Sequence, residues 1–334
     1  TLSSKRLGGE MAGPNRVIAV DLGGTQIRVA LVTADGALSH RRSIPTGSED
    51  GSALVIQRMI ALIDSVAGEA NIGSGTPIGV ASPGPLDPRT GEVLFTPNLL
   101  GWLNVPLGDL LRAGTGRPVS IANDGNCAAL GERRFGVGAG CGDLVYLALG
   151  TGVGGGVISG GRLVDGVRGL GAELGHVVVA MDGPRCTCGS VGCLEAFVAG
   201  WAIGRDGALV ATTRDGDAIR DAAEGNRVTA DAVAKAASLN DPAAIEILAR
   251  AGRALGAAIG AFINIFNPEI VVIGGGVAAI GDSLLGPARR AVSFHSFLAQ
   301  RDCVRMELSA LGEDTSLYGA AALALQPPGF AAAG

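Results

Sequence analysis

The sequence predicts an α/β fold made of two related halves with a cleft between them. Short apolar strands alternate with helical patterns along the chain, which is typical of α/β architecture. A strand, a glycine-rich turn and a returning strand occur twice, at residues 17–32 and 144–159. The length of 334 residues is sufficient for two domains of ordinary size.

The first half is expected to begin with a β-hairpin. Val17–Asp21 is an apolar run that ends in an acid, and Gln26–Val32 alternates apolar side chains after Gly23 and Gly24. The next patterns predict a helix at Ser52–Ala67, strands beginning at Pro77 and Val119, and a helix at Asn126–Phe135.

The second half repeats this plan. Leu144–Leu149 is expected to be a strand, Gly150–Gly156 a turn, and Val157–Ser159 the returning strand. A long helix is predicted at Ala243–Phe266, a buried strand at Ile270–Ile273, and a closing helix of small residues at Asp314–Leu325.

Composition narrows the class of protein. Hydrophobic residues make up 47% of the chain and charged residues 17%, so disorder is excluded for most of it. The net charge of −5 argues against nucleic acid as a ligand. The mean hydropathy is +0.38, but the uncharged stretch Leu144–Gly161 holds seven glycines and does not fit a membrane helix. We expect no membrane span, a flexible lead-in over residues 1–15, and a cytoplasmic protein with reduced thiols.

Both glycine turns have the composition of phosphate-binding loops. Glycine permits positive φ and lets backbone N–H groups approach a phosphate closely, while threonine adds a hydroxyl donor. The candidate residues are Asp21, Gly23, Gly24 and Thr25 in the first turn and Gly150, Thr151, Gly152 and Gly154 in the second. Tight hairpins also favour glycine without any ligand, which is the alternative interpretation.

Two other phosphate motifs fit less well. Gly150, Gly152 and Gly155 match the G-x-G-x-x-G pattern of dinucleotide-binding oxidoreductases, but that motif should open a helix, and here a strand follows. Lys5 and Lys235 are the chain's two lysines, and neither follows such a turn, so a Walker A loop is absent. Phosphate would have to be held by N–H groups, hydroxyls and a metal ion.

Three cysteines and a histidine predict a metal site. Cys186, Cys188 and Cys193 lie within eight residues, and His176 lies ten residues before them. Structural Zn²⁺ takes four nitrogen or sulfur ligands, which matches this set. A disulfide would leave one thiol over and suits a reducing compartment poorly. Since no ligand position remains for water, the zinc would be structural.

Together, these motifs resemble those of the ROK family of sugar kinases (repressors, open reading frames and kinases). The resemblance rests on DLGGT, GTGVGGG, ELGH and CTCGSVGCLE in this order, and it runs from about Val17 to about Leu325. It implies the actin-like two-domain fold, with ATP and sugar meeting in the cleft. The corresponding division is residues 16–121 plus 306–327 for the smaller domain and 122–305 for the larger, with a zinc loop at 173–195. A homodimer is the family expectation.

The resemblance also implies roles for individual residues. Asp124 would be the general base for the sugar hydroxyl, and His176 would contact the sugar as well as the zinc. The sugar contacts implied by the family pattern and by its substrate loop PGPLDPRTG…TPNLLGW are Gly84, Asn98, Asn123, Asp124, Glu173, His176 and Glu195. Taken alone, Asp124 could instead cap the following helix, and the two glutamates could be solvated acids.

The expected activity is ATP-dependent phosphorylation of a hexose at its 6-hydroxyl, with glucose preferred. Asp21 would position Mg²⁺, and Gly274, Gly275 and Gly276 would let the backbone approach adenine or ribose. The NDGNCAALGER stretch is also close to N-acetylmannosamine kinases, so N-acetylmannosamine, N-acetylglucosamine, mannose and fructose remain alternatives, as does polyphosphate as donor. A sugar-sensing repressor of the same family is the non-enzyme alternative. About 16 residues precede the first strand, too few for a helix-turn-helix domain.

Overall fold

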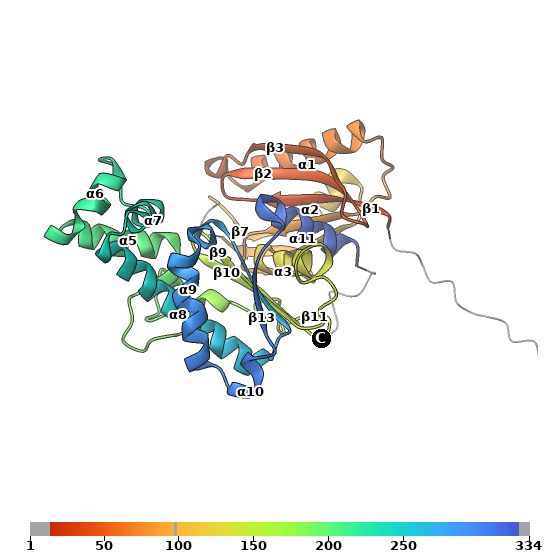
Figure 1. Ribbon diagram of the computed structural model, residues 1–334. Helices are drawn as coiled ribbons and strands as arrows, with labels where there is room; N and C mark the ends of the chain where they lie inside the picture. The colour runs from red at the N-terminus through yellow and green to blue at the C-terminus, as the bar shows by residue number, and fades with distance from the viewer. Residues whose placement is uncertain (1–13, 97–98, 327–334) are drawn as a thin grey trace, which may run out of the picture.

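A computed structural model describes residues 14–96 and 99–326, which form two five-stranded sheets of the same design (Figure 1). The first sheet has the order β3-β2-β1-β4-β8. In it, β1 pairs antiparallel with β2 and parallel with β4, and β4 pairs parallel with β8. Its strands are β1 Arg16–Leu22, β2 Gln26–Thr33, β3 Leu38–Pro45, β4 Ile78–Ser82 and β8 Val119–Asn123.

The second sheet repeats this arrangement strand for strand. Its order is β11-β10-β9-β12-β13, with β9 antiparallel to β10 and parallel to β12, and β12 parallel to β13. The strands are β9 Leu144–Leu149, β10 Val153–Ser159, β11 Arg162–Leu163, β12 Ile270–Gly274 and β13 Arg305–Leu308. The expectation of two related halves is therefore confirmed.

Helices cover the outer face of each sheet. The helices α1 Ser52–Glu69 and α2 Leu107–Thr115 pack on the first sheet around the fully buried Met59 and Leu111. The second sheet is covered by a larger helical layer around Phe262. That layer includes α4 Glu195–Val198, α5 Gly200–Ala211, α6 Asp217–Ala223, α7 Ala230–Ser238, α8 Pro242–Phe266 and α9 Asp282–His295, with α10 Leu298–Arg301 following.

Two helices, α3 Asp124–Phe135 and α11 Thr315–Ala324, pack together between the sheets (Figure 1). Glycines allow this close approach. A Cβ on Gly319 would overlap the carbonyl of Cys127, and one on Gly79 of β4 would overlap the carbonyl of Ala320. The high glycine content therefore serves backbone packing as well as turns, and it brings the start of α3 to the junction of the two sheets.

Smaller elements complete the two halves. A three-stranded sheet of β5 Leu86–Asp87, β6 Glu92–Phe95 and β7 Leu103–Val105 follows β4. Short 3₁₀ turns are η1 Ser48–Asp50, η2 Leu174–His176, η3 Arg214–Gly216, η4 Gly276–Ile280 and η5 Gly312–Asp314. Among the described residues, none of the helices is both long enough and apolar enough to cross a membrane.

Two sequence expectations about elements need correction. Residues 153–156 were expected in a turn, but they belong to β10, because glycine has no side chain whose alternation would indicate a strand. Residues 306–308 were assigned with the first half, yet they lie in β13 and pair with β12. The strand carries the sequence RMEL, whose side chains are all at least partly exposed, so it lacks the apolar run that predicts a buried strand.

Candidate active site

Asp124 lies where β8 ends and α3 begins. The N-cap of α3 is Asn123, whose side-chain oxygen accepts a hydrogen bond from the N–H of Gly125 at 2.9 Å. Asp124 therefore does not occupy the N-cap position that its alternative interpretation required; it is the first residue of the helix. Gly84 lies beside this pair, since a Cβ there would be 2.9 Å from Nδ2 of Asn123.

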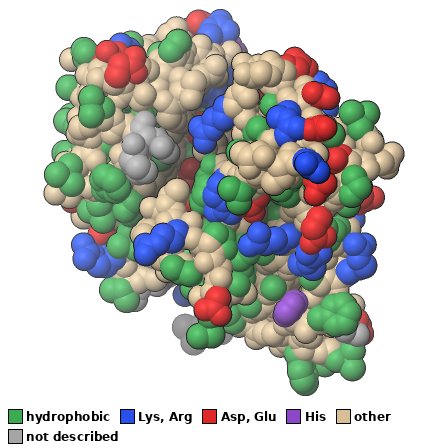
Figure 2. Space-filling model, turned by 90° about the vertical axis from the view of Figure 1, so that its left-hand side faces the viewer, with side chains coloured by type: hydrophobic (Ala, Val, Ile, Leu, Met, Phe, Trp, Pro, Cys, Tyr) green, Lys and Arg blue, Asp and Glu red, His purple; other side chains and the backbone are tan. Residues whose placement is uncertain are grey.

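The carboxyl group of Asp124 is set up to take a proton near neutral pH. Solvent reaches the side chain, but the surrounding protein still desolvates the carboxylate, and this burial raises the pKa of Asp124 to about 6. The negative charges of Asp21 and Glu173 add to the rise, while the N–H of Gly125 opposes it. Asp21, Asp124 and Glu173 are far apart in sequence but close enough in the fold to interact electrostatically. The molecular surface is hollowed between two bulky parts of the molecule (Figure 2).

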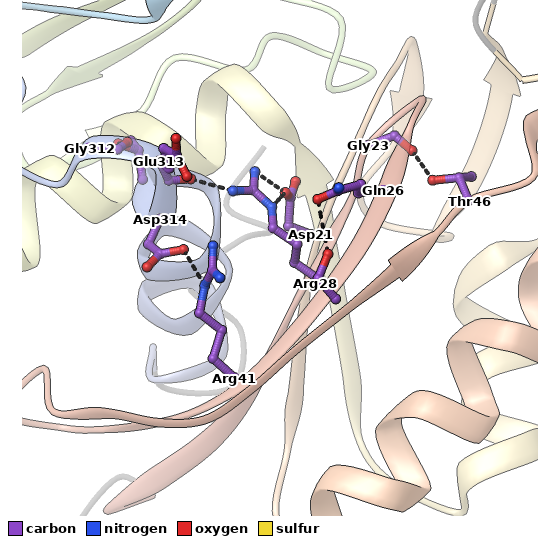
Figure 3. Close-up of polar contacts among 11 residues, drawn as sticks. Asp21, Gly23, Gln26, Arg28, Arg41, Thr46, Gly312, Glu313 and Asp314 are labelled. Carbon is purple, nitrogen blue, oxygen red and sulfur yellow. Dashed lines mark hydrogen bonds and ion pairs between the residues drawn. The ribbon is translucent and has the colours of Figure 1, made fainter.

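Asp21 lies near the end of β1 and is buried, with 5% of its surface exposed. Arg28 on β2 pairs with it, through Nε at 2.7 Å and Nη2 at 2.5 Å from Oδ2 (Figure 3). Burial raises the pKa of Asp21, and the positive charge of Arg28 opposes that rise. Arg28 was not singled out from the sequence, although a hairpin turning at residues 23–26 places residues 21 and 28 directly opposite each other.

The first glycine turn differs from expectation in its backbone. Gly23 and Gly24 do not have positive φ, and the N–H of Gly23 already donates to the carbonyl of Gln26 at 2.9 Å. The carbonyl of Gly23 accepts from the hydroxyl of Thr46 at 2.7 Å (Figure 3). In this turn, Gly24 and the exposed Thr25 are thus the better candidates for contacting a phosphate.

The second turn is shorter than predicted. It consists of Gly150, Thr151 and Gly152, none with positive φ, and the N–H of Gly150 donates to the carbonyl of Gly152 at 2.9 Å. Thr151 is exposed at the tip, whereas Gly154 lies in β10. Close packing of β10 explains Gly155 and Gly156, because a Cβ on Gly155 would lie 2.7 Å from the carbonyl oxygen of Tyr146 and one on Gly156 would lie 2.6 Å from that of Gly125.

Glu195 connects this turn to the cysteine loop. It is 8% exposed, and its Oε2 accepts from the N–H of Val153 at 3.0 Å. Its Oε1 accepts from the hydroxyl of Thr187 at 2.8 Å. The sequence suggested a sugar contact or a solvated acid, and the second of these is wrong. The structure shows a buried carboxylate whose two oxygens bind different segments.

The predicted metal ligands come together. The ligand atoms of His176, Cys186, Cys188 and Cys193 all lie within 4.8 Å of one another. Nδ1 of His176 is 3.7 Å from Sγ of Cys186, and Sγ of Cys188 is 3.8 Å from Sγ of Cys193. Ligands at zinc distances of about 2.0–2.3 Å in a tetrahedron are separated by about 3.3–3.8 Å. These two pairs match this separation, so the four groups could hold such an ion.

Gly274, Gly275 and Gly276 line a hollow of about 370 Å³ that is open to solvent. Its lining also includes Ser309, Gly312 and Glu313. Gly275 has a φ of 88°, and a Cβ there would overlap the carbonyl of Leu149, so only glycine fits. This hollow has room for a nucleoside.

The remaining predicted residues are placed as follows. Glu173 is exposed and directly precedes η2, which ends at His176. Gly175 presses this turn onto β10, because a Cβ there would overlap the carbonyl of Val153. Asn98 lies outside the described residues.

Comparisons with known proteins agree on one family. The ROK family profile matches residues 17–327. Glucokinase of Thermotoga maritima is 40% identical over 316 residues, which is 92% of this chain and 96% of that protein. The crystal structure of a ROK hexokinase from Thermus thermophilus has a TM-score of 0.78 at 33% identity and covers 92% of this chain and 97% of its own. A ROK family glucokinase from Streptomyces griseus, solved in complex with glucose and AMPPNP, has a TM-score of 0.77 at 31% identity and covers 92% and 98%.

Proposed function

This chain belongs to the ROK family, and on that premise we propose that it is an ATP-dependent hexokinase that phosphorylates glucose at the 6-hydroxyl. The observation that carries the proposal is Asp124, a carboxyl group with a pKa of about 6 at the junction of the two sheets, facing the charges of Asp21 and Glu173. A base with a pKa near the working pH is suited to accept the proton of an alcohol during phosphoryl transfer.

Each neighbouring group has a role in this reaction. The amide of Asn123 and the carboxylates of Glu173 and Glu195 would hold sugar hydroxyls, with Gly84, Asn98 and His176 completing the set. The N–H groups and hydroxyls of Gly24, Thr25, Thr151 and Gly152 would orient the phosphates, supported by Gly23, Gly150 and Gly154, which shape the two hairpins. Asp21 would hold Mg²⁺ through water, and when bound this ion neutralises charge on the transferring phosphoryl group.

The hollow beside Gly274–Gly276 would take the nucleoside of ATP. Its lining includes Gly275, Gly276 and Gly312, together with Glu313. Glycine lets these segments approach a flat base or a ribose without side-chain interference. The donor would then reach from this hollow toward the first glycine turn, where Asp21 lies.

We also assign structural Zn²⁺ to His176, Cys186, Cys188 and Cys193. Four ligands leave no open position for a reacting water, so the ion would order the loop rather than take part in chemistry. Through Thr187 and Glu195, an ordered loop would support both the sugar-binding groups and the second glycine turn.

Self-association is the further part of the proposal. Phe294, Phe297 and Leu298, at the end of α9 and the start of α10, are 83%, 68% and 60% exposed. Large apolar side chains grouped in this way favour a contact with another protein surface, and a second copy of this chain is the expected partner. Sedimentation velocity of the purified protein should give the mass of a dimer, and Phe294→Ser should shift it toward the monomer.

The experiment that tests the activity is ADP release across a panel of acceptors. Glucose, mannose, fructose, N-acetylglucosamine and N-acetylmannosamine should each be offered with ATP, and glucose also with polyphosphate. We expect the highest kcat/KM for glucose with ATP, because carboxylates and amides suit a ring of free hydroxyls. A higher kcat/KM for N-acetylmannosamine would reassign the substrate, and sugar binding without ADP release would favour the repressor alternative.

A further inference from the structure

Arg28 connects two parts of the site that are far apart in sequence. Its Nε and Nη2 contact Oδ2 of Asp21, and its Nη1 donates to the backbone carbonyl of Glu313 at 2.5 Å (Figure 3). Asp21 heads the first glycine turn, while Glu313 belongs to η5 and lines the hollow beside Gly274–Gly276. One guanidinium group therefore spans from the carboxylate to the wall of the hollow.

The pairing is asymmetric on Asp21. Both nitrogen contacts fall on Oδ2, and among the described residues no hydrogen bond reaches Oδ1. The guanidinium thus fixes the rotation of the carboxylate and leaves one oxygen free to accept from a metal-bound water. A planar arginine can do this while also donating elsewhere, because its N–H groups point in fixed directions.

Burial makes this partner necessary. Asp21 is 5% exposed, and a carboxylate removed from water in this way favours its neutral form unless a positive charge is near. Arg28 is the cation that the structure places on it. A neutral Asp21 would lose the charge that attracts a divalent cation, so the arginine preserves the function of the carboxylate rather than only its position.

The same 3₁₀ turn, η5, is held from its other side by a different arginine. Arg41 of β3 pairs with Asp314 at 2.9 Å (Figure 3). This pair anchors η5 to the first sheet and makes no hydrogen bond to Asp21, although the negative charge of Asp314 contributes to the raised pKa of Asp21. Both Arg28 and Arg41 therefore hold η5, but only Arg28 joins η5 to the buried carboxylate of Asp21.

We propose that Arg28 is a positioning residue that couples Asp21 to the wall of the nucleotide hollow, so that a divalent cation and a nucleotide bind cooperatively. This inference rests on the proposed function, because it takes the hollow as the nucleotide site and Asp21 as the group that holds Mg²⁺. A nucleotide in the hollow would restrain Glu313, and through Arg28 it would restrain the orientation of Asp21. By the reciprocity of linked binding, the cation would strengthen nucleotide binding by the same factor.

The test is equilibrium binding of ADP by calorimetry, with saturating Mg²⁺ and without added Mg²⁺, and without a chelator that would strip zinc. The measured quantity is the Kd for ADP without Mg²⁺ divided by the Kd with Mg²⁺. This ratio is compared among wild type, Arg28→Gln, Arg28→Lys and Arg41→Ala. We expect Arg28→Gln to reduce the ratio by about tenfold, since a charge-assisted link is lost. Arg28→Lys should give an intermediate ratio, because it restores the charge but cannot span both partners.

Arg41→Ala is the matched control. It releases the same turn but keeps the hydrogen bonds of Arg28 to Asp21 and Glu313, so its ratio should stay within about twofold of wild type. In turnover assays, Arg28→Gln should raise the Mg²⁺ concentration needed for half-maximal rate, with KM for sugar unchanged. A wild-type ratio in Arg28→Gln, or an equal loss in Arg41→Ala, would overturn the inference. Because ADP binding needs no acceptor, a failure of the sugar panel would reject the proposed function while leaving this comparison decisive for Arg28.

Discussion

Asn123 and Asp124 share one hydrogen-bond donor, the backbone N–H of Gly125, which lies 2.9 Å from Oδ1 of Asn123 and 2.8 Å from Oδ1 of Asp124. Asn123 alone is sufficient to cap α3. The carboxylate of Asp124 is therefore not needed to begin the helix, and its chemistry can be altered without removing the cap.

Asp124→Asn should abolish most turnover while leaving a folded protein. The amide keeps the size and the hydrogen-bonding capacity of the carboxyl group, but it cannot accept the proton of the sugar hydroxyl. We expect kcat to fall roughly 10²–10⁴-fold, with Kd for sugar and ADP changed little. Steady-state kinetics and calorimetry provide these values. Retention of more than a third of the wild-type kcat would show that Asp124 is not the base.

The pH profile should reflect the raised pKa of Asp124, about 6. A general base works when deprotonated, so kcat/KM for sugar should rise with pH and level off above about pH 7. The profile of kcat/KM reports the free enzyme, which is the state that the structure describes. A profile that is flat between pH 5 and pH 8 would contradict this assignment.

The same shift predicts an effect on stability. The folded protein holds the proton of Asp124 up to about pH 6, whereas the unfolded chain releases it near the ordinary value of 3.8. Between these values the folded state binds more protons than the unfolded state, so the contribution of Asp124 to stability falls as pH rises. Asp124→Asn should therefore have a higher Tm than wild type at pH 7, and the difference should shrink toward pH 4. A lower Tm for the variant at pH 7 would oppose this account.

Some parts of the site could be predicted from sequence because they depend on local spacing. The first hairpin, the strand before Asn123 and the His176 and Cys186–Cys193 set follow from apolar alternation and ligand spacing. The domain division remains a prediction, although β13 shows where it is inaccurate.

Other parts depend on contacts between distant segments. The link from Arg28 to Glu313 joins residues 285 positions apart, and the double role of Glu195 needs Val153 and Thr187 to meet it. The Asp21–Arg28 pair was predictable in principle, since the register of a hairpin determines which residues face each other. The backbone of the glycine turns was not predictable, because glycine adopts extended and turning conformations equally well.

Removing one cysteine should release the metal and weaken sugar binding more than nucleotide binding. Wild type should hold about one zinc per chain, and Cys188→Ser should hold less, since Cys188 is one of four converging ligands. Loss of order in the loop would reach Glu195 through Thr187, so KM for sugar should rise more than KM for ATP. Cys303→Ser, at an exposed cysteine away from this set, is the control and should keep its zinc. Full zinc content in Cys188→Ser would remove Cys188 from the ligand set.

Gly125→Ala should be destabilising even though alanine is the better helix former. A methyl group at this position would overlap the carbonyl oxygen of Gly155, a backbone atom of β10 that cannot rotate away. Helix propensity favours alanine by about 1 kcal/mol, whereas forcing α3 from the sheet costs about 1–3 kcal/mol and often more. The cost of the steric overlap should exceed the gain in helix propensity, so the unfolding free energy measured in urea should fall. Gly154→Ala is the matched control on β10, because its nearest neighbour would be Cβ of Ala148 at 3.9 Å, an ordinary contact. Displacing α3 also moves Asp124, so Gly125→Ala should lose kcat together with stability. Equal stability of Gly125→Ala and wild type would mean that the start of α3 can move relative to β10, and that the position of the catalytic base is not set by this contact.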